Sequence, residues 1–132
     1  MVDSKGYLKL VNLSTAKLLK PDQASRTNTI ISTPHYMAPE IIIGKGYNHL
    51  VDLWSLGICL FEFMCGYLPF GDDAEGPYEI YDDIMRNELK FPEFIKDKKA
   101  KKLMEQLLNH NPEVRHNGSY ANLKSNPWFE GF

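Results

Sequence analysis

Two long stretches of the chain carry apolar residues at helical spacing. From about 49 to 65, apolar side chains occupy nearly every helical face, a pattern typical of a buried helix. Asn48 is a candidate N-cap for this helix, and Gly66 is a candidate end. Asp97 is a candidate N-cap for the second helix, whose apolar residues fall at i, i+3, i+4, i+7 and i+8. These residues are Ala100, Leu103, Met104, Leu107 and Leu108.

Shorter elements surround these two helices. Residues 1–11 combine turn chemistry with β-compatible side chains and predict a β-hairpin. Residues 12–36 are polar and weakly periodic, which predicts a long loop. We expect further helices over 39–43, where a proline opens and a glycine closes the pattern, over about 77–87, and over 120–125. The fold class that follows is mainly α, with helices gathered around one buried helix.

Composition narrows the function classes. With 17 acidic and 15 basic residues among 132, the chain lacks the charge excess of a nucleic-acid or membrane surface. Cys59 and Cys65 would face different sides of one helix, which argues against a disulfide or a metal site. Free thiols suit a reducing compartment, so we expect a cytoplasmic protein. The apolar run from 53 to 65 is too short to span a bilayer, and Glu62 interrupts it.

Four motifs follow one another in a recognisable order. Residues 33–40 read Thr-Pro-His-Tyr-Met-Ala-Pro-Glu, and residues 52–57 read Asp-Leu-Trp-Ser-Leu-Gly. Arg115 follows, and 127–129 read Pro-Trp-Phe. In order and spacing this set resembles the C-terminal part of a eukaryotic Ser/Thr protein kinase catalytic domain. Within that family, residues 26–29 and the last five residues resemble the AGC group, and the cyclic-GMP-dependent kinases, protozoan ones included, are the most similar.

The resemblance implies a domain organisation. Residues 1–132 would form an incomplete protein-kinase-like large lobe. In it, 1–11 would be the hairpin, 12–40 the activation segment and 41–132 a helical subdomain. Residues 33–40 would then end the activation segment, and 52–57 would begin the central helix.

The resemblance also implies structural roles. Glu40 would form an ion pair with Arg115 and so tie the activation segment to the lobe, as against two separately solvated charges. Asp52 lies in an apolar helix, where a buried carboxylate needs hydrogen-bond donors; in the family, the catalytic loop supplies them. Without that loop, Asp52 is either unsatisfied or served by Ser55 and local amides. Trp54 belongs to the same motif and is expected to be structural.

Three further positions concern regulation and substrate. Thr29 corresponds to the activation-loop phosphothreonine of the family, where a phosphate would order the loop through cationic partners. Thr33 resembles the threonine that contacts the catalytic base, although ordinary loop polarity would also explain it. Glu62 either reads an arginine of basic substrate peptides or serves as a structural hydrogen-bond acceptor, and both interpretations stay open.

The chain departs from an active kinase in what it lacks. Its 132 residues contain no glycine-rich phosphate loop, no phosphate-binding lysine and no catalytic loop, which we expect before residue 1. Where the family has Asp-Phe-Gly, this sequence has Asn12, Leu13 and Ser14. A neutral Asn12 is a much weaker ligand for Mg²⁺ than a carboxylate. We therefore expect no catalytic residue, no metal site and no cofactor here; ATP and Mg²⁺ belong only to a complete family member.

Three interpretations remain at this point. The favoured one is a large-lobe portion of a Ser/Thr kinase that is catalytically incomplete as it stands. The second is a pseudokinase-type module that binds a protein or peptide without phosphoryl transfer, and the third is a fragment or truncated gene model of a longer active kinase. In each case the central helix lacks the helices that cover it in a full lobe, so we expect an exposed apolar patch, a covering partner or self-association.

Overall fold

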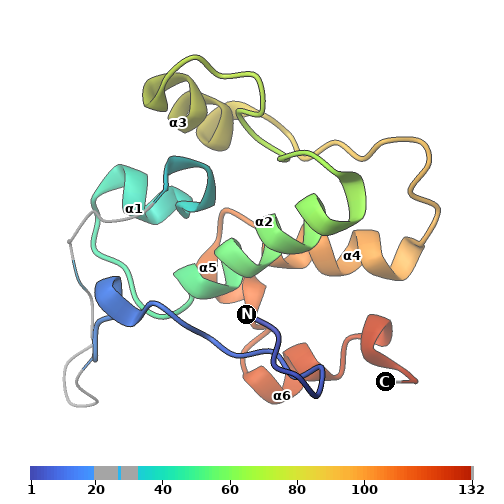
Figure 1. Cartoon of the computed structure of the whole chain (residues 1–132). Helices are drawn as coiled ribbons and strands as arrows, with labels where there is room; N and C mark the ends of the chain where they lie inside the picture. The colour runs from blue at the N-terminus through green and yellow to red at the C-terminus, as the bar shows by residue number, and fades with distance from the viewer. Residues whose placement is uncertain (20–26, 28–32, 132) are drawn as a thin grey trace.

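The computed structural model describes residues 1–19, 27 and 33–131, and it is mainly helical in these ranges. Its α-helices are α1 (Pro39–Ile43), α2 (Val51–Cys65), α3 (Pro77–Arg86), α4 (Lys98–Leu107), α5 (Pro112–Arg115) and α6 (Tyr120–Lys124). Three 3₁₀ helices complete the set: η1 (Leu13–Thr15), η2 (Pro34–Tyr36) and η3 (Pro127–Phe129). In Figure 1, α2 crosses the centre of the molecule with α4 beside it, while α3 lies above and α6 below.

Local sequence signals explain the helix ends. Asp97 caps α4 by accepting hydrogen bonds from the backbone N–H groups of Lys99 and Ala100. Pro39 opens α1, and Gly44 closes it in the left-handed conformation, with a φ of +72°. Gly66 ends α2 in the same way, with a φ of +83°. These ends agree with the sequence predictions.

The start of α2 corrects a prediction. The helix begins at Val51 rather than near 49, and its N-cap is Leu50 rather than Asn48. The side chain of Asn48 accepts a hydrogen bond from Leu50 N–H at 3.0 Å, which forms a turn ahead of the helix. The short helix α5 was not predicted, because four residues are too few to show a hydrophobic period.

The core lies between α2 and its neighbours. Trp54, Ile58 and Phe61 project from α2 and are fully buried. Trp54 stacks on Phe70 with ring centroids 5.8 Å apart, and α4 packs along α2. The five apolar residues of α4 and its C-cap that were predicted to face inward, Ala100, Leu103, Met104, Leu107 and Leu108, are all buried. Burial of these side chains is the main favourable term for this fold.

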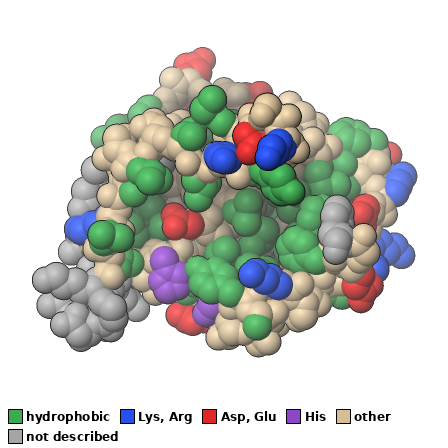
Figure 2. Space-filling view, turned by 60° about the horizontal axis from the view of Figure 1, so that its bottom comes forward, with side chains coloured by type: hydrophobic (Ala, Val, Ile, Leu, Met, Phe, Trp, Pro, Cys, Tyr) green, Lys and Arg blue, Asp and Glu red, His purple; other side chains and the backbone are tan. Residues whose placement is uncertain are grey.

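The apolar composition of α2 predicted a helix buried on all sides, and the structure differs from this prediction. Leu56 is 53% exposed and Phe63 is 83% exposed, so one stripe of α2 faces solvent. The expected apolar patch is therefore present on α2. Figure 2 shows that apolar side chains also reach the surface on the face of the molecule that carries the N-terminus and α6. Among the described residues, no helix combines the length and apolar character needed to cross a bilayer.

The predicted N-terminal hairpin is not confirmed. Within the described ranges this region forms no β-strand. It has one antiparallel bridge, between Val2 and Leu8, flanked by backbone hydrogen bonds from Asp3 N–H to Tyr7 C=O and from Lys9 N–H to Met1 C=O, around a turn closed by Gly6 N–H and Asp3 C=O. Leu8 and Leu10 are 84% and 95% exposed. A two-stranded hairpin without a covered face has little to stabilise it, which explains why the pairing between residues 1–3 and 7–9 does not grow into regular strands.

Candidate functional site

Glu40 and Arg115 form the ion pair expected from the motifs. Arg115 Nη1 donates to Glu40 Oε1 at 2.6 Å, and Nη2 donates to Oε2 at 2.8 Å. Glu40 lies in the first turn of α1 and Arg115 in the last turn of α5. The Arg115 side chain is fully buried and that of Glu40 is 14% exposed. Two parallel, charge-assisted hydrogen bonds therefore join α1 to the helical core.

Arg115 makes further contacts that explain its burial. Its Nε donates to the carbonyl oxygen of Asn109 at 2.8 Å, and Nη1 also reaches the carbonyl oxygen of Leu50 at 3.2 Å. The guanidinium carbon lies 5.2 Å from the centroid of the Trp54 ring. A buried cation needs its donors satisfied, and here a carboxylate, two carbonyls and an aromatic face do so. Trp54 thus packs in the core and against the Arg115 guanidinium.

Segment 33–40 is also held to α2 through Tyr36. The Tyr36 hydroxyl donates to Glu62 Oε2 at 2.8 Å, and Ser55 Oγ donates to the Tyr36 carbonyl oxygen at 2.9 Å. The hydrogen bond to Glu62, with burial and the Glu62 charge, raises the pKa of Tyr36 to about 12. Glu62 therefore serves as a structural acceptor. Its reading of a substrate arginine stays a prediction.

A third contact connects segment 33–40 to the turn after α2. His35 Nε2 lies 3.1 Å from the carbonyl oxygen of Gly71, whose N–H donates to Asp83 Oδ2 at 3.1 Å. Gly71 has a φ of +65°, and a Cβ at this position would lie 2.9 Å from Ile80 Cγ1. Only glycine suits this turn without strain. The sequence pattern did not indicate this junction, because it depends on how α3 docks.

The remaining predicted site residues are more exposed. Thr33 precedes η2, is exposed, and makes no side-chain capping hydrogen bond there. Thr29 lies outside the described residues. Asp52 was expected to be buried, and this is wrong: its side chain is exposed on the first turn of α2. Ser55 does not serve it, since Ser55 Oγ donates to the Tyr36 and Val51 carbonyls instead.

Asn12 does not offer a site suited to Mg²⁺. The residue is in the left-handed conformation with a φ of +60°, and its Oδ1 accepts a hydrogen bond from Ser14 Oγ at 2.8 Å. A neutral amide oxygen already engaged in this way is a poor ligand for a hard cation. Across the described part of the chain, no three His, Cys, Asp or Glu side chains converge as a metal-binding group. Asn12 as it is held here is therefore a weaker ligand for Mg²⁺ than the aspartate that the family has at this position.

A hollow of about 750 Å³ brings two of the predicted positions together. Asn12 and Asp52 both line it, along with Ser55 and residues of the segment 10–19. Asp52 also influences Tyr120, whose pKa is raised by burial and then by the Asp52 charge.

The two cysteine thiols, Cys59 and Cys65, have raised pKa values, mainly because of burial, and so are not activated nucleophiles.

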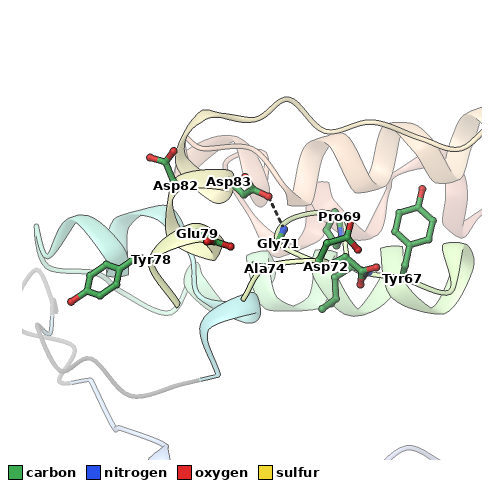
Figure 3. A pocket seen from close by; sticks show the side chains of 11 residues that line it. Tyr67, Pro69, Gly71, Asp72, Ala74, Tyr78, Glu79, Asp82 and Asp83 are labelled. Atoms are coloured by element: carbon green, nitrogen blue, oxygen red, sulfur yellow. Dashed lines mark hydrogen bonds between the residues drawn. The ribbon is translucent and has the colours of Figure 1, made fainter. Parts of the chain in front are cut away.

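An acidic groove of about 860 Å³ was missed by sequence reasoning. It lies between the turn after α2 and helix α3 (Figure 3). Three of its acidic side chains, Asp72, Asp83 and Glu79, accept hydrogen bonds from the backbone N–H groups of Leu68, Gly71 and Glu75. They therefore shape the turns around the groove. The density of acids between 72 and 83 was the signal that could have indicated it.

Comparison with known proteins agrees with this geometry. The protein kinase domain model matches residues 1–129. The chain is 46% identical over 135 residues to the cGMP-dependent protein kinases of Eimeria tenella and Toxoplasma gondii, which covers all of this chain and 13% of each relative. It is 42% identical to that of Plasmodium berghei, over 15% of that protein. The chain belongs to the protein kinase family, and it spans about one seventh of the length of these relatives.

Proposed function

We propose that this chain forms the helical, substrate-side portion of the large lobe of a Ser/Thr protein kinase of the cGMP-dependent type. In the complete protein this portion would support transfer of the γ-phosphate of ATP to serine or threonine of a protein substrate in the cytoplasm. The observation that carries the proposal is the two-point ion pair between Glu40 and Arg115, within motifs that match the family over nearly the whole chain.

The polypeptide of residues 1–132 would not catalyse this transfer by itself. Phosphoryl transfer depends on positioning and charge stabilisation of the phosphates, and these residues supply neither a phosphate-binding loop nor a charged metal ligand at position 12. We expect isothermal titration with ATP and Mg²⁺ to give no micromolar binding, and a radiolabelled phosphate assay to give no transfer. Micromolar binding or stoichiometric transfer by the purified chain would contradict this part of the proposal.

The second candidate function is a protein-interaction module without chemistry. The conformation of Asn12 favours it, because the left-handed backbone and the bond from Ser14 direct the amide to a local role. Genomic sequence upstream separates the candidates: an in-frame catalytic loop and small lobe support the kinase portion, and a true start-codon context supports the module.

Peptide binding tests the substrate-side role that both candidates share. A fluorescent serine peptide rich in arginine should bind the chain, and the same peptide with citrulline in place of arginine should bind less, if Glu62 reads the cationic side chain. Glu62→Gln should reduce this difference, because it removes the negative charge but keeps an acceptor for the Tyr36 hydroxyl. Equal anisotropy curves for both peptides would show that Glu62 acts only as a structural acceptor.

A further inference from the structure

Two amide side chains and two backbone groups near the C-terminus form an unbroken series of hydrogen bonds, here called the amide relay. Asn126 Nδ2 donates to Gln106 Oε1 at 3.0 Å, and Gln106 Nε2 donates to the backbone carbonyl oxygen of Arg115 at 3.0 Å. At the other end, Asn126 Oδ1 accepts from Trp128 N–H at 3.0 Å, which caps η3. The relay therefore runs from η3 through α4 to the last residue of α5.

The direction of every hydrogen bond in the relay is fixed by its two ends. Trp128 offers a backbone N–H, so the Asn126 oxygen must face it and the Asn126 NH₂ must face Gln106. The Gln106 oxygen is then the acceptor, which leaves its NH₂ for the carbonyl of Arg115. That carbonyl lies at the end of a helix, where no intrahelical donor is available. The relay thus satisfies a group that the short helix α5 leaves open.

The relay ends on the backbone of Arg115, the residue whose guanidinium pairs with Glu40, so it can help to position that guanidinium. The Arg115 backbone is held by Gln106, while its guanidinium is held by Asn109 C=O, Leu50 C=O and Glu40. An arginine forms two parallel bonds to a carboxylate only when the guanidinium lies in a narrow range of positions. The backbone from which the side chain extends must therefore be fixed as well. Gln106 is the side chain that fixes it from the rigid helix α4.

We propose that Gln106 and Asn126 are positioning residues for Arg115, so that the C-terminal helix η3 is coupled to the ion pair that anchors segment 33–40. Trp128 strengthens this coupling, because it packs against the buried apolar residues around Trp54 and also against those around Leu103. Displacement of η3 would release Asn126, loosen Gln106 and widen the range of positions open to the Arg115 guanidinium. The inference rests on the proposed function only where it treats Glu40 as part of an activation segment.

Asn126→Asp is the first test, because the carboxylate keeps the acceptor that caps η3 and replaces the donor to Gln106 by a negatively charged acceptor. The readout is the Arg115 Nε–H resonance in ¹⁵N NMR spectra of the full chain, followed by hydrogen exchange. We expect a shifted resonance and roughly fivefold to tenfold faster exchange, as loss of one net hydrogen bond gives. Asn111→Asp is the matched control: it also keeps its capping acceptor, to Glu113 N–H, and lies outside the relay.

Gln106→Met supplies a second, independent variant, since methionine matches the length of glutamine without its polar atoms. It should change the Arg115 resonance in the same way, and combining it with Asn126→Asp should add little, because both remove one network. Unchanged Arg115 exchange in both variants, or fully additive effects, would overturn the proposal. The readout requires neither nucleotide nor phosphate transfer, so it can succeed or fail independently of the proposed kinase function.

Discussion

Arg115 and Glu40, 75 positions apart in the chain, meet through two hydrogen bonds of 2.6 and 2.8 Å in a nearly solvent-free setting. The pair joins the short helix that ends segment 33–40 to the helices of the C-terminal half. Because the guanidinium is completely buried, its charge depends on Glu40 for compensation. This dependence makes the pair the point at which the two halves of the described structure can be uncoupled.

Glu40→Gln should strongly destabilise the chain. The substitution keeps the size of the side chain but leaves the buried Arg115 charge unpaired, which costs about 3–5 kcal/mol of unfolding free energy. Urea denaturation followed by tryptophan fluorescence measures this change, since Trp54 lies against the guanidinium.

The matched control is Glu130→Gln. It removes the partner of Lys99 in an ion pair of similar length, 2.7 Å, whose side chains are 54% and 68% exposed. Exposed pairs contribute about 0–1 kcal/mol, so this variant should unfold almost like the parent. Similar losses for Glu40→Gln and Glu130→Gln would mean that burial does not govern the Glu40 pair.

Local signals made part of this molecule predictable. Both ends of α1 and the start of α4 follow from Pro39, Gly44 and Asp97, which act within one helical turn. The exposure of Asp52 was not predictable in this way, since periodicity shows that a helix is apolar but not which neighbours cover it. The same holds for Phe63, which the composition of α2 assigned to the interior.

The residues of the candidate site also divide into those that sequence motifs predict and those that only the folded structure brings together. The pairing of Glu40 with Arg115 could be predicted, because both residues belong to recognisable motifs of the family and the sequence between them does not affect that assignment. The groove beside Asp83 and the relay through Gln106 arise only when distant turns and helices dock. Neither the groove nor the relay corresponds to a regular spacing of residues in the sequence, so neither could be predicted without the structure.

Tyr36 should titrate well above the ordinary tyrosine pKa of 10.0. Its pKa of about 12 reflects first the hydrogen bond to Glu62, with burial and the Glu62 charge adding to it. A difference absorbance titration between the parent and Tyr36→Phe isolates this group among the seven tyrosines. Glu62→Gln should bring the pKa of Tyr36 back toward 10, because the amide oxygen accepts a hydrogen bond from the hydroxyl without carrying a negative charge.

The same shift sets a pH dependence of stability. A raised pKa in the folded state means that the neutral phenol is favoured there, so this contribution is complete below pH 10. It is lost as the pH rises from 10 through about 12. The parent should lose stability over that interval more steeply than Glu62→Gln. Parallel curves for the two proteins would show that the Tyr36–Glu62 bond does not influence the titration.

Gly57→Ala should destabilise the chain although alanine favours helices. A Cβ at position 57 would lie 2.9 Å from Leu107 Cβ and 2.9 Å from Leu108 Cδ2, where α2 packs on α4. Overpacking of this kind costs about 1–3 kcal/mol, which exceeds the gain of about 1 kcal/mol in helix propensity. Thermal unfolding by circular dichroism measures the balance. Leu56→Ala on the exposed stripe of the same helix is the control, and a higher melting temperature for Gly57→Ala would refute the close packing.

Phe63 should promote self-association of the isolated chain. It lies with Leu56, Cys59 and Leu60 on one stripe of α2 at helical spacing, and it is 83% exposed. An exposed apolar stripe of this kind favours association or binding of an apolar dye. In size-exclusion chromatography with light scattering, the parent should show a mass that rises with concentration, and Phe63→Ser should shift it toward the monomer. Tyr78→Ser, at an 86% exposed aromatic residue of α3, should leave the mass unchanged. A parent that stays monomeric and binds no dye would show that this stripe does not mediate association.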